Sequence, residues 1–513
     1  MGKKSEKKQP RVAAVAIGRQ ENRYAREWVE HYLKMGFAHL YICDNNRLNE
    51  EHFEDVLQDY IEHKKVTVLD YRDRATCILK AYTETYNLIK GEYDWIGVFD
   101  FDELLDIRRG DLQSFLACRK GDCVLVNWEC YGDNGLTRYE DEPMAERFTK
   151  PLPHPLYVQY DDEAENDHVK SFVRGGLDGI AYRATPHVPD GCRSYERANG
   201  EACNSEPLQP FDGKAAVLRH YITKTAEEWV DKFRRGGCDR KFETWQKQYQ
   251  DRFFAYNRRT KEKEKILNSI YEKVVAIVHY NTPELTEATI KSIRKHGGES
   301  YRIVIFDNSD ERPFRSKMKG VEVVDNTEGQ IINFDKELAK FTEKDDSIGV
   351  CGKCIHGSTK HTISVQKLWD LIPGGFLLMD SDILLKDTVD FMFMFDQCCC
   401  GHIQESSKSG NPFGIARLVP FLLWINVPMC VNGGARFFDP KRTWGLLPGG
   451  RKNRNNWYDT GASFLEDIRT LKPQCHGKRI DIRPLMVHKQ SGSWNKHGVS
   501  DAAWLEANAS LWK

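Results

Sequence analysis

The sequence predicts an α/β protein with two tandem Rossmann-like domains, each built on a mixed, mostly parallel sheet and joined by a helical linker. Each half opens with a short β-branched strand, at residues 12–17 and 274–278, followed by a polar turn and a helical pattern. Later in each half, an apolar strand ends in two aspartates separated by one residue. The length of 513 residues also favours more than one domain.

The elements after the opening strand follow the same order in both halves. A helical pattern comes first, with apolar residues at helical spacing: Trp28, Val29, Tyr32 and Leu33 in the first half, and Leu285, Ile290 and Ile293 in the second. A second strand then ends in an Asp-Asn pair, namely Asp44-Asn45 and Asp307-Asn308. Because open parallel sheets bind ligands at the carboxyl ends of their strands, a nucleotide is predicted to lie beside these pairs.

The pattern divides the chain into four segments. Residues 1–10 form a basic disordered tail, 11–238 the first domain, 239–272 a helical linker and 273–513 the second domain. The linker region is rich in Lys, Arg and Glu with interspersed large apolar residues, so packed helices are expected rather than a flexible Gly/Ser tether.

Composition excludes several classes of function. The 75 Lys and Arg residues nearly cancel the 76 Asp and Glu residues, which disfavours a nucleic-acid binder driven by bulk positive charge. No apolar run reaches the roughly 18 to 20 residues that span a bilayer, and no signal peptide precedes the first strand. A cytoplasmic protein is therefore expected, with reduced cysteines. The basic tail is either solvated or in peripheral contact with the inner face of the plasma membrane.

The spaced aspartates indicate metal chemistry on a diphosphate. Asp100 and Asp102 end one strand, and Asp380 and Asp382 end the corresponding strand of the second half. Two carboxylates in this arrangement suit Mg²⁺ or Mn²⁺, with substrate phosphates completing the coordination. Such an ion stabilises a diphosphate leaving group. Glycine-rich Walker and dinucleotide motifs are missing from the sequence, which argues against P-loop kinases and nicotinamide enzymes.

The first half resembles bacterial glycosyltransferases of the family 2-like group that is related to family 92, with a GT-A fold. The resemblance covers about residues 11–238 and keeps the order and spacing of its motifs. The main matching motifs are Glu21-Asn22, residues 26–31, residues 41–45, residues 99–103, residues 131–135, Val169-Lys170-Ser171, His187-Val188-Pro189, His220-Tyr221, Lys224, Glu228 and residues 232–236.

The second half resembles a family 2 glycosyltransferase domain over about residues 273–495. The motifs are shorter: residues 278–281, Asp307-Asn308-Ser309, Asp380-Ser381-Asp382, Asp459-Thr460-Gly461 and Val487-His488. The resemblance of the two halves implies two fused GT-A domains.

The resemblance also implies roles for single residues. Asp44 and Asp307, with Asn45 and Asn308 beside them, would hold the base or ribose of the donor. The four spaced aspartates would hold the metal and the sugar diphosphate. Each GT-A domain often adds a histidine, which would be His187 or the competing His220 in the first domain and His488 in the second. Lys170 would face the first diphosphate.

Further candidates come from local patterns. His361 precedes a helix-like segment, so it either faces the second diphosphate or belongs to a plain helix N-terminus. Inverting transfer needs a carboxylate that removes the acceptor proton. Asp459, on a turn before the helix of residues 462–471, is the candidate in the second domain, with Glu466 and Asp467 as alternatives. In the first domain Glu129 and Asp133 are the weaker candidates.

These expectations combine into one function. The chain is expected to be a bifunctional, metal-dependent, inverting glycosyltransferase. It would add two sugars from nucleotide donors, UDP-sugars foremost, to a saccharide or lipid-linked saccharide of a surface or capsular polysaccharide. The alternative is one catalytic domain plus a non-catalytic GT-A module that binds the acceptor or a partner.

Overall fold

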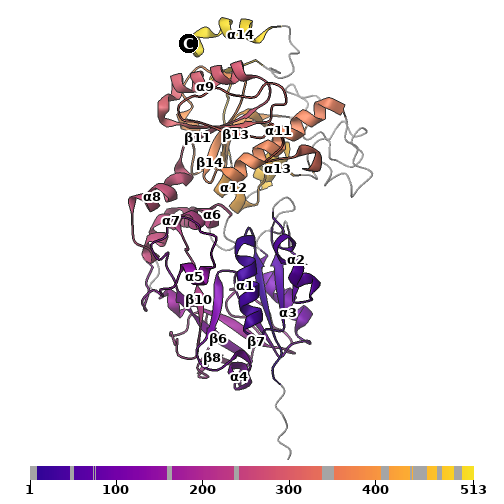
Figure 1. Ribbon diagram of the computed structural model, residues 1–513, viewed down its shortest axis with the longest axis vertical. Coiled ribbons are helices and arrows are strands. Elements are labelled where there is room, and N and C mark those ends of the chain that lie inside the picture. The colour runs from indigo at the N-terminus through magenta and orange to yellow at the C-terminus, as the bar shows by residue number, and fades with distance from the viewer. Residues whose placement is uncertain are drawn as a thin grey trace, which may run out of the picture. The chain divides into compact units, whose positions relative to one another are not determined.

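The computed structural model describes residues 9–46, 51–72, 74, 77–158, 164–235, 242–337, 352–405, 415–439, 442, 459–470, 477–489 and 499–513, without the side chains of 242–247, 299 and 352–358. The chain divides into two compact units, Met1–Leu267 and Asn268–Lys513 (Figure 1). Most of the tail expected at residues 1–10 lies outside the described residues. Most of the segment expected as a linker lies within the first unit.

The described residues of the first unit form a ten-stranded sheet in the order β3-β2-β1-β4-β7-β6-β10-β5, with β8 on β6 and β9 on β8. Strands β1 to β4 are parallel to one another, and β7 is antiparallel to β4 and β6. The bounds are β1 Val12–Gly18, β2 His39–Asp44, β3 Val66–Asp70, β4 Trp95–Val98, β5 Glu103–Ile107, β6 Cys123–Cys130, β7 Val169–Arg174, β8 Tyr195–Arg197, β9 Ala202–Cys203 and β10 Ala216–His220.

Helices cover both faces of this sheet. Alternate β1 residues face opposite sides, as the period of a strand requires. Val12, Ala14 and Ala16 join the core of α1 and α2, whereas Ala13 and Val15 join the core of α3. The helices are α1 Asn22–Lys34, α2 Glu54–Glu62, α3 Ile78–Ile89, α4 Leu112–Ala117, α5 Met144–Arg147, α6 Ala226–Arg235, α7 Phe242–Tyr256 and α8 Lys261–Leu267.

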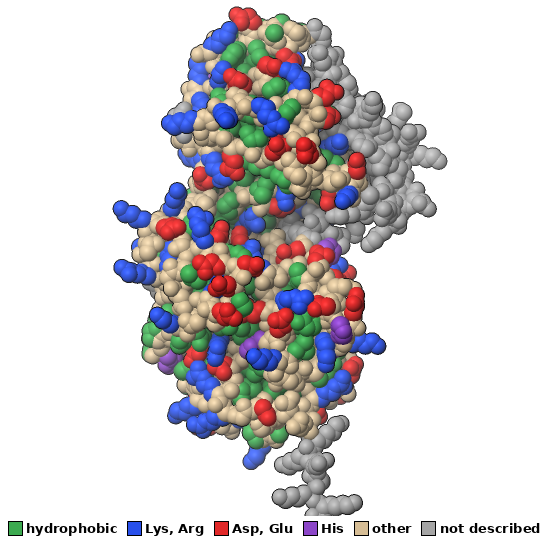
Figure 2. Space-filling view, in the orientation of Figure 1, with side chains coloured by type: hydrophobic (Ala, Val, Ile, Leu, Met, Phe, Trp, Pro, Cys, Tyr) green, Lys and Arg blue, Asp and Glu red, His purple; other side chains and the backbone are tan. Residues whose placement is uncertain are grey.

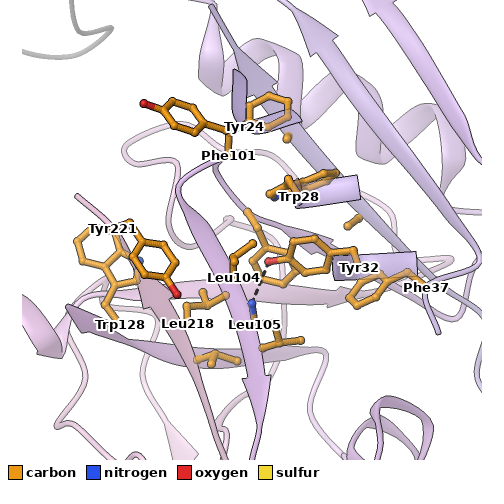
Figure 3. Close-up of a cluster of buried hydrophobic side chains, with 14 of the residues drawn as sticks. Tyr24, Trp28, Tyr32, Phe37, Phe101, Leu104, Leu105, Trp128, Leu218 and Tyr221 are labelled. Atoms are coloured by element: carbon orange, nitrogen blue, oxygen red, sulfur yellow. Dashed lines mark hydrogen bonds between the residues drawn. The ribbon is translucent and has the colours of Figure 1, made fainter. Parts of the chain in front are cut away.

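The strand after the first aspartate pair is fixed to the core by Tyr32. Its hydroxyl donates to the carbonyl of Glu103 at 3.0 Å and accepts from the Leu105 N–H at 3.2 Å. Figure 3 shows the second of these bonds, with the ring of Tyr32 among the other buried aromatic side chains of the cluster. The start of β5, and with it the neighbouring aspartates, is therefore held at a defined place.

The second unit has a seven-stranded sheet among its described residues, in the order β13-β12-β11-β14-β17-β16-β18, and a separate β15-β19 pair. Strands β11 to β14 are parallel, and β17 is antiparallel to β14 and β16. The bounds are β11 Val274–His279, β12 Arg302–Asp307, β13 Val321–Asp325, β14 Gly375–Asp380, β15 Ile383–Leu385, β16 Cys399–Gln404, β17 Arg417–Asn426, β18 Lys478–Arg479 and β19 Met486–His488.

The first helix of the second unit, α9, follows β11 as α1 follows β1. Ile290 and Ile293 of α9 share a core with Val275 and Ile277 of β11. The helices are α9 Pro283–Gly297, α11 Gly352–Leu371, α12 Val427–Gly433, α13 Ala462–Thr470 and α14 Asp501–Ala507. The predicted α/β class with two sheet-containing halves is confirmed.

The surface agrees with the balanced composition. On the face drawn in Figure 2, Lys and Arg side chains are interspersed with Asp and Glu side chains over the described residues. Within the described part of the chain, no helix is long and apolar enough to cross a membrane.

Candidate functional site

The loops after β2 and β12 have the same construction in the two units. The Asn46 N–H donates to Oδ1 of Asp44 at 2.9 Å, and the Ser309 N–H donates to Oδ1 of Asp307 at 3.0 Å. Both aspartates are fully buried. Their second oxygens also have partners, which are Arg72 for Asp44 at 2.8 Å and the Phe314 N–H for Asp307 at 2.7 Å. Both carboxylates thus shape the edge of the sheet where a nucleotide is expected.

The neighbouring asparagines bond to the chain as well. The Asn45 side chain donates to the carbonyls of Tyr71 and Arg74 at 2.9 and 2.8 Å, and the Asn308 side chain donates to Ser364 at 2.8 Å. A nearby group of Asp44, His52 and Glu54 is close enough to hold a metal. Arg72 already bridges its two carboxylates, with Glu54 at 2.7 Å, so this group is an ion-pair network.

The second unit brings the expected metal ligands together. Asp380, Asp382 and His488 each offer a ligand atom, and these atoms lie within 4.8 Å of one another. Nε2 of His488 lies 3.1 Å from Oδ1 of Asp382 and 3.7 Å from Oδ2 of Asp380. Burial lowers the pKa of His488, but the two carboxylates outweigh it and raise the pKa overall. One imidazole and two carboxylates in this geometry fit a divalent cation.

His361 lies beside Asp380, and the expectation that it precedes a helix is wrong, because it is inside α11 (Gly352–Leu371). Its Nε2 is 3.6 Å from Oδ1 of Asp380 and is buried without a hydrogen-bond partner among the described residues. Burial lowers the pKa of His361, which keeps the ring neutral. Burial also raises the pKa of Asp380. A histidine nitrogen without a hydrogen-bond partner beside a carboxylate is a further position for a cation.

Asp459 is held just before α13 by an ion pair with Arg417 and by the Thr460 N–H at 2.8 Å. The backbone turns there through Gly461, which has a φ of +85°. A Cβ at this glycine would lie 2.1 Å from the Leu418 carbonyl oxygen. The alternatives Glu466 and Asp467 are ion-paired with Arg442 at 3.4 and 2.6 Å.

The first unit surrounds its aspartate pair with lysines. Lys170 donates to Oδ2 of Asp100 at 2.8 Å, and Tyr82 donates to Oδ1 at 2.7 Å. Lys224 and Lys232 both donate to Oδ2 of Asp102, at 3.2 and 2.9 Å. Burial opposes ionisation of both aspartates, but the lysines outweigh it and lower both pKa values, that of Asp102 most. Among the described residues these aspartates are not part of a group spaced to hold a metal.

The histidine that faces Asp102 is His220. The strand after each aspartate pair is antiparallel to a late strand, and the registers pair Glu103 with His220 and Ile383 with His488. The residue after each histidine donates its N–H to the second aspartate's carbonyl, Tyr221 to Asp102 at 2.9 Å and Lys489 to Asp382 at 3.1 Å. His220 thus occupies the position of His488, with Nε2 3.8 Å from Oδ1 of Asp102.

His187 has different surroundings. Its ring contacts the edge of the Trp128 ring, and its Nδ1 lies 2.9 Å from the Val169 carbonyl oxygen. Burial lowers its pKa to about 3, so the ring is neutral. Trp128 also donates to the Glu103 carboxyl at 2.8 Å. Burial raises the pKa of Glu103 to about 8.

Glu129 and Asp133 both have cationic partners. Glu129 accepts from Arg108 at 2.6 Å and from the Tyr131 hydroxyl at 2.9 Å. Asp133 forms an ion pair with Lys263 of α8 and accepts from the Gly135 N–H at 2.8 Å. These contacts give both residues a part in holding the loop after β6.

Sequence reasoning gave no role to Lys224, Lys232 or Arg417. The two lysines belong to the motifs that resemble a known family, but nothing in their spacing indicates that they meet Asp102. Arg417 begins β17 and has no neighbouring motif. These contacts arise from tertiary structure, which periodicity does not encode.

Comparison with known proteins gives a match to one family. Residues 17–122 match glycosyltransferase family 92, which supports a glycosyltransferase. This segment contains the end of β1, the strands β2 to β5 and the Asp100–Asp102 pair. None of the curated proteins compared with the chain matches it significantly.

Similar solved structures include TarS from S. aureus, residues 1–349, at 10% identity, 48% coverage of this chain, 70% coverage of TarS and a TM-score of 0.25. The complex of the same TarS segment with UDP-GlcNAc has 10% identity, coverages of 50% and 78%, and a TM-score of 0.25. The mannosyltransferase PcManGT from Pyrobaculum calidifontis, in complex with GDP-Man and Mn²⁺, has 13% identity, coverages of 25% and 37%, and a TM-score of 0.17.

Proposed function

We propose that the chain is a glycosyltransferase that uses nucleotide-sugar donors and adds two sugars, one at each unit, to a saccharide or lipid-linked saccharide. The family match over residues 17–122 supports the transferase activity of the first unit. The observation that supports the second site best is the cluster of Asp380, Asp382 and His488 at the carboxyl end of β14. Strand ends of this kind are where open α/β sheets bind their ligands.

The proposed chemistry follows from this cluster. Asp380, Asp382 and His488 would hold Mn²⁺ or Mg²⁺, which when bound neutralises the diphosphate as it leaves. Asp459 would accept the proton of the acceptor hydroxyl, and such proton transfer contributes roughly 10²- to 10⁴-fold. Attack opposite the leaving diphosphate inverts the anomeric centre. Arg417, paired with Asp459, would hold this carboxylate in place.

A second candidate is one catalytic unit with a non-catalytic companion. Lys224 and Lys232 already bond to Asp102 in the first unit, whereas in the second unit Asp382 lies beside His488 in a group spaced to hold a metal. This difference favours unequal roles for the two units. In that case the second unit would transfer sugar and the first would bind the acceptor or a partner.

The test uses the full chain and a panel of nucleotide sugars, UDP-sugars foremost, with Mn²⁺ and with added saccharide acceptors. Donor hydrolysis and transfer are measured for the wild type, for Asp380→Asn with Asp382→Asn, and for Asp100→Asn with Asp102→Asn. Each double variant should lose one transfer and keep the other. Loss of all transfer in only one double variant would favour the single-catalyst candidate, and no turnover of any donor by the wild type would contradict both.

A further inference from the structure

The first unit contains a basic pocket next to Asp102. The pocket is small and partly open to solvent. Its lining has five basic and two acidic side chains together with Gln20 and Tyr24: Arg23, Lys224, Lys232, Arg234, Arg235, Glu228 and Asp231. One of the acidic side chains, Glu228, is already neutralised by a buried ion pair with Arg147 at 2.9 Å. Arg23 is paired with Asp231 and Arg235 with Glu21, so the positive charge beside Asp102 comes from Lys224 and Lys232.

Lys224 is held in this pocket at an energetic cost. Its side chain is 3% exposed, and its ammonium lies 3.2 Å from Oδ2 of Asp102 and 4.7 Å from the centre of the Tyr24 ring. Its backbone φ is +52°, in the left-handed region that side chains other than glycine rarely adopt. Fixing a charged residue in a strained, buried position is typical of a functional site.

A second strained residue lines the same pocket. Gln20 also has a φ of +52°, and its N–H donates to Oδ1 of Asn46 at 2.7 Å. Gln20 follows β1, at the edge where a nucleotide is expected. In the second unit, Asn281 follows β11 with a φ of +55° and donates to Ser309 at 2.9 Å. The pocket thus begins at the same place in the fold as the proposed donor site.

Of the two lysines that bond to Asp102, Lys232 is the more exposed. Its side chain is 26% exposed, and its ammonium donates to Asp102 at 2.9 Å and to the Ile222 carbonyl at 3.0 Å. An ammonium group has three donors, so one remains for a ligand. Asp102 thereby orients two lysines toward the pocket. A cation at Asp102 would instead lie next to two positive charges.

We propose that this pocket binds the diphosphate of a nucleotide donor through Lys224 and Lys232 without a divalent cation, so that the two units differ in their need for metal. The proposal rests on the proposed function for the identity of the donor. Asp100 and Asp102 then act as positioning residues for the lysines. The charge that a cation supplies in the second unit comes here from ammonium groups, which bind phosphate as point charges.

The test measures binding of inorganic pyrophosphate and of UDP to the full chain in excess EDTA by calorimetry. The wild type should bind one equivalent of each. Lys232→Gln should weaken both by roughly tenfold or more, because a charge-assisted hydrogen bond is lost, and Lys232→Arg should restore most of the binding. Lys224→Gln should give the same loss where circular dichroism shows that it folds. The matched control is the exposed Lys80→Gln, which should bind both probes as the wild type does.

Two results would overturn the proposal: no binding of either probe in EDTA, or binding that neither lysine variant weakens. Sugar transfer, measured separately, distinguishes this failure from failure of the proposed function. Transfer by the wild type with strictly metal-dependent binding at both units contradicts this proposal alone. Lysine-dependent binding of pyrophosphate in EDTA without turnover of any nucleotide sugar supports the pocket and contradicts the transferase.

Discussion

Nε2 of His488 lies 3.1 Å from Oδ1 of Asp382, and the strand register places His488 directly opposite the residue that follows this aspartate. The first unit repeats the register with His220 and Asp102. There, however, Nε2 of His220 lies 3.8 Å from Oδ1 of Asp102, and two lysines are paired with Oδ2 of the same carboxylate. The corresponding aspartates of the two units, Asp102 and Asp382, therefore have different neighbours. This difference underlies the proposal that the second unit holds a cation and the first uses lysines.

Asp459 should be essential for transfer at the second unit if it is the base. Asp459→Asn is expected to lower kcat by roughly 10²- to 10⁴-fold, because the amide cannot accept the acceptor proton. KM for the donor should change little. Steady-state kinetics of the full chain measure this, with Glu466→Gln on the following helix α13 as the comparison. Full activity in Asp459→Asn and loss in Glu466→Gln would move the role to Glu466.

Arg147 should be important for the stability of the first unit. It forms a buried ion pair with Glu228, and both side chains are 1% exposed. Arg147→Ala leaves Glu228 buried without its charge partner, which is expected to cost about 3–5 kcal/mol. Urea denaturation followed by tryptophan fluorescence measures the loss. The control Arg138→Ala removes an exposed contact with Glu227 and should cost less than about 1 kcal/mol. Equal effects of the two changes would contradict the account.

Substitution of Gly461 should destabilise the fold for two reasons, the positive φ and the close Leu418 carbonyl. Gly461→Ala places a side chain at a φ of +85° and a Cβ 2.1 Å from the Leu418 carbonyl oxygen. Gly434→Ala has the matching φ of +86° but meets nothing within 4 Å, so it measures the backbone cost alone, about 1–2 kcal/mol. Gly461→Ala should lower the denaturation midpoint further than Gly434→Ala. Similar denaturation midpoints for the two variants would contradict this, because they would mean that the backbone at Leu418 moves away from the new Cβ without loss of stability.

His187 should make the first unit sensitive to acid. Its folded-state pKa is about 3, and the ordinary value is 6.5. Between these values the unfolded chain binds a proton that the folded chain does not, so stability falls as pH drops below 6.5. His187→Gln cannot titrate and should flatten the decline in melting temperature between pH 6.5 and 4.5. An unchanged slope would mean that the ring is accessible to protons in the fold.

Local pattern was sufficient to predict the strands and the aspartates at their ends. Asp100, Asp102, Asp380 and Asp382 follow apolar runs whose length and composition indicate buried strands, and the structure has β4 and β14 there. The α/β class was predictable for the same reason. His488 could be predicted as a metal ligand because the resemblance to GT-A glycosyltransferases implies a histidine late in the domain.

The partners of the aspartates were not predictable in this way. The resemblance named His220 only as the competing histidine, and its contact with Asp102 depends on the β5-β10 pairing, which joins segments far apart in the chain. Lys224 reaches the same carboxylate through a left-handed backbone that lysine rarely adopts, so propensity gives no indication of it. The ion pair of Arg417 with Asp459 likewise joins distant segments. Such contacts follow from packing of the whole unit.

The most direct test of the account is Mn²⁺ binding to the full chain in the presence of UDP, followed by electron paramagnetic resonance of the free ion. The account predicts one tightly bound Mn²⁺ per chain, with affinity lowered more than tenfold in Asp382→Asn and in His488→Gln. Asp102→Asn, checked for folding by circular dichroism, should bind Mn²⁺ as the wild type does. Loss of Mn²⁺ binding in Asp102→Asn together with wild-type binding in Asp382→Asn would contradict the account.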